Sequence, residues 1–128
     1  MKISIDKSEQ YAIFEVATDK LVQANCTKVK SELVVLQAEG FRNIIFDARN
    51  IESLDADGAE VLLVLHRLCT EADGIFIFVN ASDSVDQFLR MAQLHDVLNQ
   101  LPTVAEAIDA VFLSEIEAQL KLEDPGNA

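Results

Sequence analysis

Several residue types are scarce or missing in this chain of 128 residues, and each absence narrows what the protein can be. Tryptophan is absent and only 6% of the residues are aromatic, which predicts a core built from aliphatic side chains. No run of 18 apolar residues occurs, so we expect no membrane span. The N-terminal segment alternates apolar and polar residues and lacks the apolar middle of a signal peptide, which predicts a cytoplasmic protein.

Cysteine and histidine are also scarce. Cys26 and Cys69 fall in two predicted helices, where we expect buried small side chains rather than a disulfide. His66 and His95 are predicted to lie on different helices, and no further ligands stand at metal-binding spacing around them. The sequence therefore predicts no metal site and no cofactor.

Basic residues are outnumbered. The formal net charge is −12, from 22 acids and 10 bases, and no lysine occurs between Lys30 and Lys121. Such a surface repels phosphate backbones, so we expect no nucleic-acid binding, and it favours basic protein partners. The alternative, of equal weight, is that the acids only keep the domain soluble.

Strand-like and helix-like segments alternate along the chain, which predicts an α/β fold with a mainly parallel sheet. We expect one domain over residues 1–122 and a flexible tail over residues 123–128, which contain proline and glycine. We expect an edge strand around Ile3 and Ile5, strands at residues 11–16 and 43–47, a central strand at 75–79 and a short extended segment at 97–101. We expect helices at residues 21–38 and 56–72, a helix capped by Ser82, and a last helix that starts with a capping box of Thr103 and Glu106.

The most informative segment is an acidic turn between the buried strand at 43–46 and an apolar helix. We define the acidic turn as Asp55, Ala56, Asp57 and Gly58. Asp55 is a good N-cap, because its side chain can accept the free N–H groups of the first helical turn. Asp57 then lies in that first turn, where the helix dipole favours negative charge. Such a turn beside a sheet is a natural place for anion chemistry or docking.

This order of segments resembles the STAS domain, the family of bacterial anti-sigma factor antagonists. The resemblance covers roughly residues 10–115 and is carried by four stretches: NIIFDA (43–48), AEVLLVLHRL (59–68), GIFIFVN (74–80) and SDSVDQFLRMA (82–92). It implies a single STAS-like domain with a central mixed, mainly parallel sheet of four to five strands and about four surrounding helices. Family members usually carry Asp-Ser-Ser-Gly at the turn, with the second serine phosphorylated. Here Ala56 and Asp57 take the two serine positions.

The resemblance implies a non-catalytic regulator of transcription that works by binding another protein through the acidic turn. In the family, this turn docks on a kinase-type anti-sigma factor, and phosphorylation of the second serine blocks docking. Because Asp57 holds that position, we expect no phosphorylation there. The alternative within the family is an accessory subunit or scaffold, for example of a lipid transporter.

Enzyme and calcium hypotheses fit the residues less well. A calcium loop starting at Ser53 would need a glutamate where Val64 stands. A phosphatase built on Asp55 and Asp57 would need a stronger preceding strand and a later lysine. A response-regulator receiver built on Asp47 would also need a lysine after a late strand, and none is present. We therefore predict no catalytic residues.

The helix at 56–72 is apolar over more of its circumference than burial on one sheet face requires. Its polar stripe consists only of Glu60, Arg67 and Glu71. One interpretation is burial between the sheet and neighbouring helices. The other is that Leu63 or Val64, which flank the stripe, contacts a partner or a second copy in a homodimer.

Overall fold

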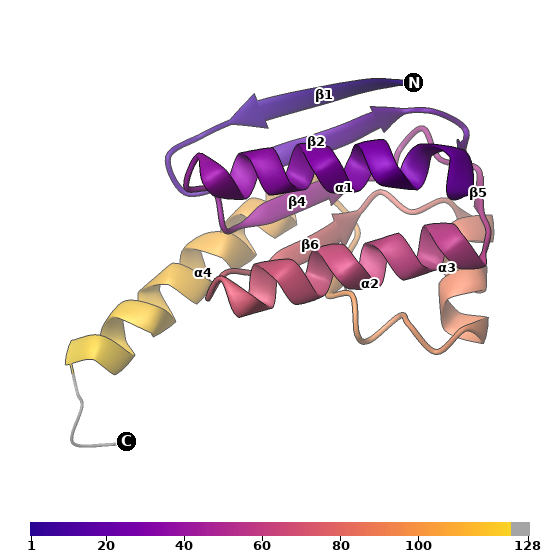
Figure 1. The fold of residues 1–128 in the computed structure, drawn as a ribbon. Coiled ribbons are helices and arrows are strands. Elements are labelled where there is room, and N and C mark those ends of the chain that lie inside the picture. The colour runs from indigo at the N-terminus through magenta and orange to yellow at the C-terminus, as the bar shows by residue number, and fades with distance from the viewer. Residues whose placement is uncertain (124–128) are drawn as a thin grey trace.

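The computed structural model describes residues 1–123 and contains the predicted alternation of strands and helices (Figure 1). In chain order its elements are β1 (Lys2–Lys7), β2 (Ala12–Ala17), β3 (Lys20–Leu21), α1 (Gln23–Ala38), β4 (Ile44–Asp47), β5 (Ser53–Leu54), α2 (Ala56–Glu71), β6 (Phe76–Val79), α3 (Asp83–Met91), β7 (Gln100–Leu101) and α4 (Val104–Glu123).

Five strands form the main sheet in the order β1-β2-β4-β6-β7. Strand β1 pairs antiparallel with β2, and the other pairs are parallel. This confirms the predicted mixed, mainly parallel sheet with four helices. Helices α1 and α2 lie side by side on one face of the sheet, and α4 crosses the other face (Figure 1).

Side chains of alternating direction on the strands build a core on each face of the sheet. The α1 and α2 side contains a ladder of phenylalanines, in which Phe46 stacks between Phe14 and Phe78 at centroid distances of 5.6 and 5.5 Å. Phe76 also contacts Phe46, at 6.1 Å. The prediction of an aliphatic core was therefore incomplete, because four of the few aromatic residues are all placed at buried strand positions.

Several predicted boundaries were wrong. The first helix begins at Gln23 rather than residue 21, because Lys20 and Leu21 pair with Ser53 and Leu54 in a second, two-stranded sheet. The strand expected to be central is next to the edge strand β7, and β4 is central. His95 lies in the turn after α3 and not in a helix. Of the expected tail, Glu123 ends α4, and residues 124–128 lie outside the described part of the chain.

Helix α4 packs on the sheet through its first half only. Ala107 and Val111 are fully buried against Ile45, Ile77 and Val79. The Thr103 hydroxyl accepts from the Glu106 N–H at 3.2 Å, which confirms the Thr103 half of the predicted capping box.

The second half of α4 departs from the prediction. Helical spacing predicts one buried stripe along this helix, formed by Val104, Ile108, Val111 or Phe112, Ile116 and Leu120. Of these, Val111 is buried, whereas Ile116 and Leu120 are 55% and 58% exposed. The reason is visible in Figure 1, where the second half of α4 extends past the edge of the sheet.

A buried asparagine fixes the point at which α4 leaves the body. Asn43 is 2% exposed, and its amide donates to the Gln10 carbonyl at 2.8 Å and to Glu115 Oε1 at 2.7 Å. Its side-chain oxygen accepts from the Ile75 N–H at 3.0 Å. Arg42 adds two contacts to the Glu115 carboxylate, at 3.3 and 2.7 Å. Glu115 therefore attaches α4 to the amino ends of β2 and β4.

The attachment should depend on pH. Hydrogen bonds from Arg42 and Asn43 hold the pKa of Glu115 below its usual value. A carboxyl group whose pKa is lower in the folded chain than in the unfolded chain contributes stability above the unfolded pKa, and that stability is lost as the pH falls through the folded pKa. We expect Glu115→Gln to lower the free energy of unfolding by about 1 kcal/mol at pH 7. Urea titrations of both proteins should show this difference shrinking as the pH falls below the ordinary glutamate pKa; a difference that stays constant would contradict the ion pair as its cause.

Candidate partner-binding site at the acidic turn

The acidic turn is held in place by backbone hydrogen bonds around a two-stranded sheet. Strands β3 and β5 pair in parallel, and the N–H groups of Glu52 and Ser53 donate to the Asp19 carbonyl at 2.7 and 3.1 Å. The Asp55 N–H points to the Leu21 carbonyl at 3.4 Å. These contacts join the turn to the chain that leads into α1. Two-residue strands have no periodicity, so sequence patterns could not indicate this support.

Asp55 and Gly58 have structural roles in the turn. Asp55 Oδ1 accepts from the Gly58 N–H at 2.8 Å, which confirms Asp55 as the N-cap of α2. A Cβ atom on Gly58 would lie only 2.1 Å from the Leu21 carbonyl oxygen and 3.1 Å from Leu54 Cβ. Glycine is therefore required where the first turn of α2 crosses β3 and β5.

The two middle residues of the turn are in the opposite situation. Ala56 and Asp57 are both exposed at the N-terminus of α2, and Glu60 is exposed one turn further along. The turn thus divides into two residues that hold the fold, Asp55 and Gly58, and two that face outward.

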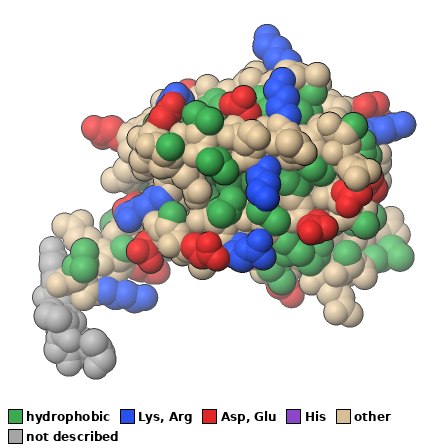
Figure 2. Space-filling model, viewed as in Figure 1, with side chains coloured by type: hydrophobic (Ala, Val, Ile, Leu, Met, Phe, Trp, Pro, Cys, Tyr) green, Lys and Arg blue, Asp and Glu red, His purple; other side chains and the backbone are tan. Residues whose placement is uncertain are grey.

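A shallow groove of about 210 Å³ lies beside Asp57, between α1 and α2. Figure 2 looks onto the α1 and α2 side of the molecule, where hydrophobic side chains are exposed among acidic and basic ones. The groove combines apolar, acidic and basic side chains, namely those of Gln23, Cys26, Thr27, Lys30, Asp57, Glu60, Val61 and Val64.

Cys26 marks the contact between α1 and the turn. Its thiol lies 3.5 Å from the Asp57 carbonyl oxygen and 3.3 Å from the Val22 carbonyl oxygen. Burial, followed by the negative charges of Asp55, Asp57 and Glu60, raises the pKa of Cys26. Burial raises the pKa of Cys69 to about 12. Both cysteines therefore remain neutral thiols at pH 7. Cys69 is buried as expected, whereas Cys26 is only half-buried.

The two predicted interface residues, Leu63 and Val64, have different surroundings in the structure. Leu63 is half-buried and packs against the core on the α1 and α2 side of the sheet. Val64 is also half-buried, but it lines the groove together with Asp57 and Glu60. Positions 57, 60 and 64 lie on one face of α2 because they are three and four residues apart.

Asp47, considered above as a receiver-type acid, is held by neighbouring side chains. It is 1% exposed and accepts hydrogen bonds from the Arg49 side chain at 2.9 Å and the Asn80 amide at 3.0 Å. A carboxylate so buried and paired stabilises the carboxyl edge of the sheet and is not open to a phosphoryl donor.

The family of the chain follows from comparison with known proteins. A sequence model of the STAS domain matches residues 2–107, so the chain belongs to the STAS domain family. Among curated sequences, none matches. Within residues 1–123, no helix has both the length and the apolar character needed to cross a membrane.

Solved structures share the fold at low sequence identity. The anti-sigma factor antagonist SpoIIAA in its unphosphorylated form is 17% identical, with a TM-score of 0.74 over 86% of this chain and 96% of that one. An anti-sigma factor antagonist from Mycobacterium paratuberculosis is 14% identical, with a TM-score of 0.75 over 86% of this chain and 92% of that one. A murine anion transporter, Slc26a9, is 14% identical with a TM-score of 0.70, over 84% of this chain but 18% of its own length.

Proposed function

We propose that this chain is a cytoplasmic, non-catalytic regulator that binds another protein through the acidic turn and the adjoining groove. The observation that carries the proposal is the exposure of Ala56 and Asp57 on a turn whose other two residues are fixed by the fold. Family membership and the anti-sigma factor antagonists among the structural neighbours support this class of function. No step of the proposal involves a metal, a cofactor or turnover of a substrate.

The proposed partner is a protein with a basic docking surface, and a kinase-type anti-sigma factor is the specific candidate. Asp57 and Glu60 line the groove, the charge of Asp55 also acts on Cys26 in its wall, and the whole chain has a net charge of −12. Complementary charge would steer such a partner to the turn and fix its orientation. The neighbour SpoIIAA has also been solved in a phosphorylated form, so this fold carries a phosphoryl group in that protein.

In our proposal this chain lacks the serine switch. A phosphoryl group on serine adds about −1.5 to −2 charges. Asp57 instead places a permanent charge of about −1 at that position. A carboxylate is not an acceptor for a serine kinase, and the nearest hydroxyl along the chain, that of Ser53, belongs to β5 on the other side of the Asp55 cap.

The first test is phosphorylation and binding by a kinase-type anti-sigma factor from the same organism. After incubation with this kinase and ATP, peptide mass spectrometry should find no phosphate on residues 51–60. A stoichiometric phosphate there would contradict the proposal that this chain lacks the serine switch.

Calorimetry then compares the chain with Asp57→Ser, and with Glu60→Gln as a control that removes one charge from the same groove but outside the serine position.

The sign of the Asp57→Ser effect distinguishes two forms of the proposal. Tighter binding means that Asp57 imitates the phosphorylated, released state, because an unpaired carboxylate is costly to desolvate at an interface. Weaker binding means that the partner supplies a basic side chain and that docking is constitutive. Failure of both proteins to bind would contradict the anti-sigma factor partner. Hydrolysis of a phosphoester that is abolished by changing Asp55 or Asp57 would contradict the non-catalytic assignment.

The groove wall provides a second test. We expect Val64→Ser to weaken partner binding, or self-association if the partner is a second copy, while lowering the free energy of unfolding by about 0.5–1 kcal/mol. Leu63→Ser is the matched control and should cost about 2 kcal/mol of stability, because Leu63 packs against the core. Thermal melts together with sedimentation measurements separate the two effects. If both variants lose only stability, α2 is merely a buried helix.

The murine anion transporter supports a second candidate function, an accessory or scaffold role beside a membrane transporter. In that case the chain should bind a transporter subunit of the same organism through the same turn. Binding to such a subunit, together with no binding to any anti-sigma factor, would favour this alternative.

A further inference from the structure

A second exposed surface lies far from the acidic turn, on the second half of α4. We call residues 112–122 the α4 arm. Its large apolar side chains are 44–82% exposed: Phe112, Leu113, Ile116, Leu120 and Leu122. Gln10 and Arg42, which border the arm, precede β2 and β4 at the amino edge of the sheet, whereas the acidic turn follows β4 at the opposite edge. Figure 1 shows these regions at opposite ends of the molecule.

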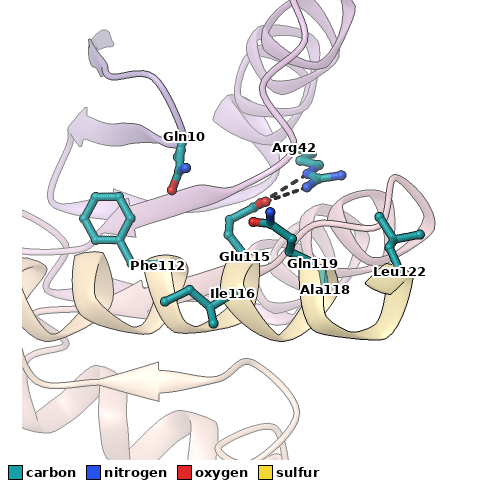
Figure 3. A pocket seen from close by; sticks show the side chains of 8 residues that line it. All are labelled: Gln10, Arg42, Phe112, Glu115, Ile116, Ala118, Gln119 and Leu122. Atoms are coloured by element: carbon teal, nitrogen blue, oxygen red, sulfur yellow. Dashed lines mark hydrogen bonds and ion pairs between the residues drawn. The ribbon is translucent and has the colours of Figure 1, made fainter. Parts of the chain in front are cut away.

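The arm and the body enclose a groove of about 400 Å³ (Figure 3). The Arg42–Glu115 pair lies between Phe112 at one end of the groove and Leu122 at the other. Phe112 is held edge-on against Tyr11 at a centroid distance of 6.2 Å. The groove is therefore formed in advance, with fixed polar groups at its centre and apolar groups at its ends.

The arm has the residue pattern of an amphipathic helix whose apolar face is uncovered. Its apolar residues recur at positions 112, 113, 116 and 120, the spacing of one helical face. The second half of α4 extends past the edge of the sheet, so that face has no sheet to pack on there (Figure 1). Short helical segments are marginally stable in water unless an apolar face is covered, and contiguous apolar surface at an edge marks an interaction site.

Charge indicates which kind of partner fits. Helix α4 carries five acids and one lysine. Among the acids at 104–122, whose side chains the structure describes, only Glu115 forms an ion pair, with Arg42. Of the other acids, Asp109 and Glu117 are exposed beside the apolar face, and Glu106 is exposed nearer the start of the helix. A second copy would bring the same acids and a further net charge of −12 to this surface, and like charges oppose association.

From these observations we propose that the α4 arm and its groove bind an amphipathic helix of another protein, one whose apolar stripe is flanked by lysine or arginine. The apolar stripe would cover Phe112, Ile116 and Leu120. The flanking cations would meet acids such as Asp109 and Glu117. This is helix-in-groove recognition, in which anchors at i, i+3 or i+4, and i+7 give affinity and the surrounding charges give selectivity.

The test uses three synthetic peptides of about 18 residues. The first is an amphipathic helix with leucines on one face and lysines beside them. The second has glutamate in place of every lysine, and the third is a scramble of the first with no apolar face. Fluorescence anisotropy at several salt concentrations measures binding to the full chain and to two variants. One variant is Ile116→Gln with Leu120→Gln; the control is Val34→Gln with Val35→Gln, which removes apolar side chains of similar exposure from α1.

We expect the lysine peptide to bind the chain and the control variant equally, and to bind the arm variant at least about tenfold more weakly. The glutamate peptide and the scramble should bind at least about tenfold more weakly to the unchanged chain. Amide chemical shifts of the unchanged chain should move on α4 and near Gln10 and Arg42, which keeps the test valid if the arm variant folds poorly.

Any of four outcomes would overturn the proposal. The first is no binding of the lysine peptide. The second is equal binding of the scramble or the glutamate peptide, and the third is equal binding to both variants. The fourth is a dimer in sedimentation that is lost in the arm variant, which would assign the surface to a second copy of this chain.

Discussion

Replacing Asn43 with alanine is expected to destabilise the fold by about 3 kcal/mol, the largest effect that we predict for a single substitution. The amide of Asn43 joins three segments: the Gln10 carbonyl before β2, the Ile75 N–H before β6, and Glu115 on α4. Alanine would leave the first two without their partner in a place where water has little access, since Asn43 is 2% exposed. Leaving buried polar groups unpaired costs more than a hydrogen bond contributes when it is made.

Urea denaturation at pH 7 measures this effect, with Asn50→Ala as the matched control. The Asn50 side chain also forms hydrogen bonds to another segment, to Glu15 at 3.1 Å and to the Val16 carbonyl at 3.3 Å, but Asn50 is exposed. We expect the control to cost about 0.5 kcal/mol. Asn43→Asp separates shape from hydrogen bonding, because it keeps the volume but turns a carboxylate toward Glu115. An Asn43→Ala variant as stable as the control would contradict the role of Asn43 as a joint.

Asn43 also shows where sequence patterns reach their limit. Its place at the start of a buried strand was predicted, because Ile44, Ile45 and Phe46 form an unbroken apolar run. Its contact with Glu115, 72 positions away, depends on where α4 crosses the sheet. The sequence of α4 predicts a helix with an apolar stripe, but the same stripe is compatible with burial and with an exposed arm. Only the length of the sheet decides that Ile116 and Leu120 extend beyond it.

The candidate site divides in a similar way. The caps at Asp55 and Ser82 follow from residue type and position before an apolar helix, and both are confirmed. The groove could not be predicted, because Cys26 and Lys30 come from α1 and meet Asp57 only through the packing of α1 against α2. Leu63 and Val64 appeared equivalent on a helical wheel. They differ in the structure because the core approaches α2 from the side of Leu63.

A second large effect is expected at Gly58, where alanine should cost about 2–3 kcal/mol through overpacking. The added methyl group would lie 2.1 Å from the Leu21 carbonyl oxygen, closer than any real contact, and that oxygen belongs to backbone that cannot rotate away. Either α2 must move outward or the pairing of β3 with β5 must open. We expect the second, because that pairing involves only two residues on each strand. Thermal melting measures the loss of stability, and hydrogen exchange at Glu52 and Ser53 reports the opening.

The control for Gly58→Ala is Ala56→Ser, which adds one heavy atom to an exposed residue of the same turn and should change stability by less than about 0.5 kcal/mol.

The contrast between these two positions tests the division of the acidic turn into structural and outward-facing residues. If Gly58→Ala is destabilising while Ala56→Ser and Asp57→Ser are not, then the glycine of the acidic turn is a requirement of the fold. Positions 56 and 57 can then vary without cost to stability, so the residues at these two positions are not determined by the fold. A Gly58→Ala variant with unchanged stability and unchanged exchange would show that α2 can shift freely, and the turn would then be a mobile docking element instead of a fixed one.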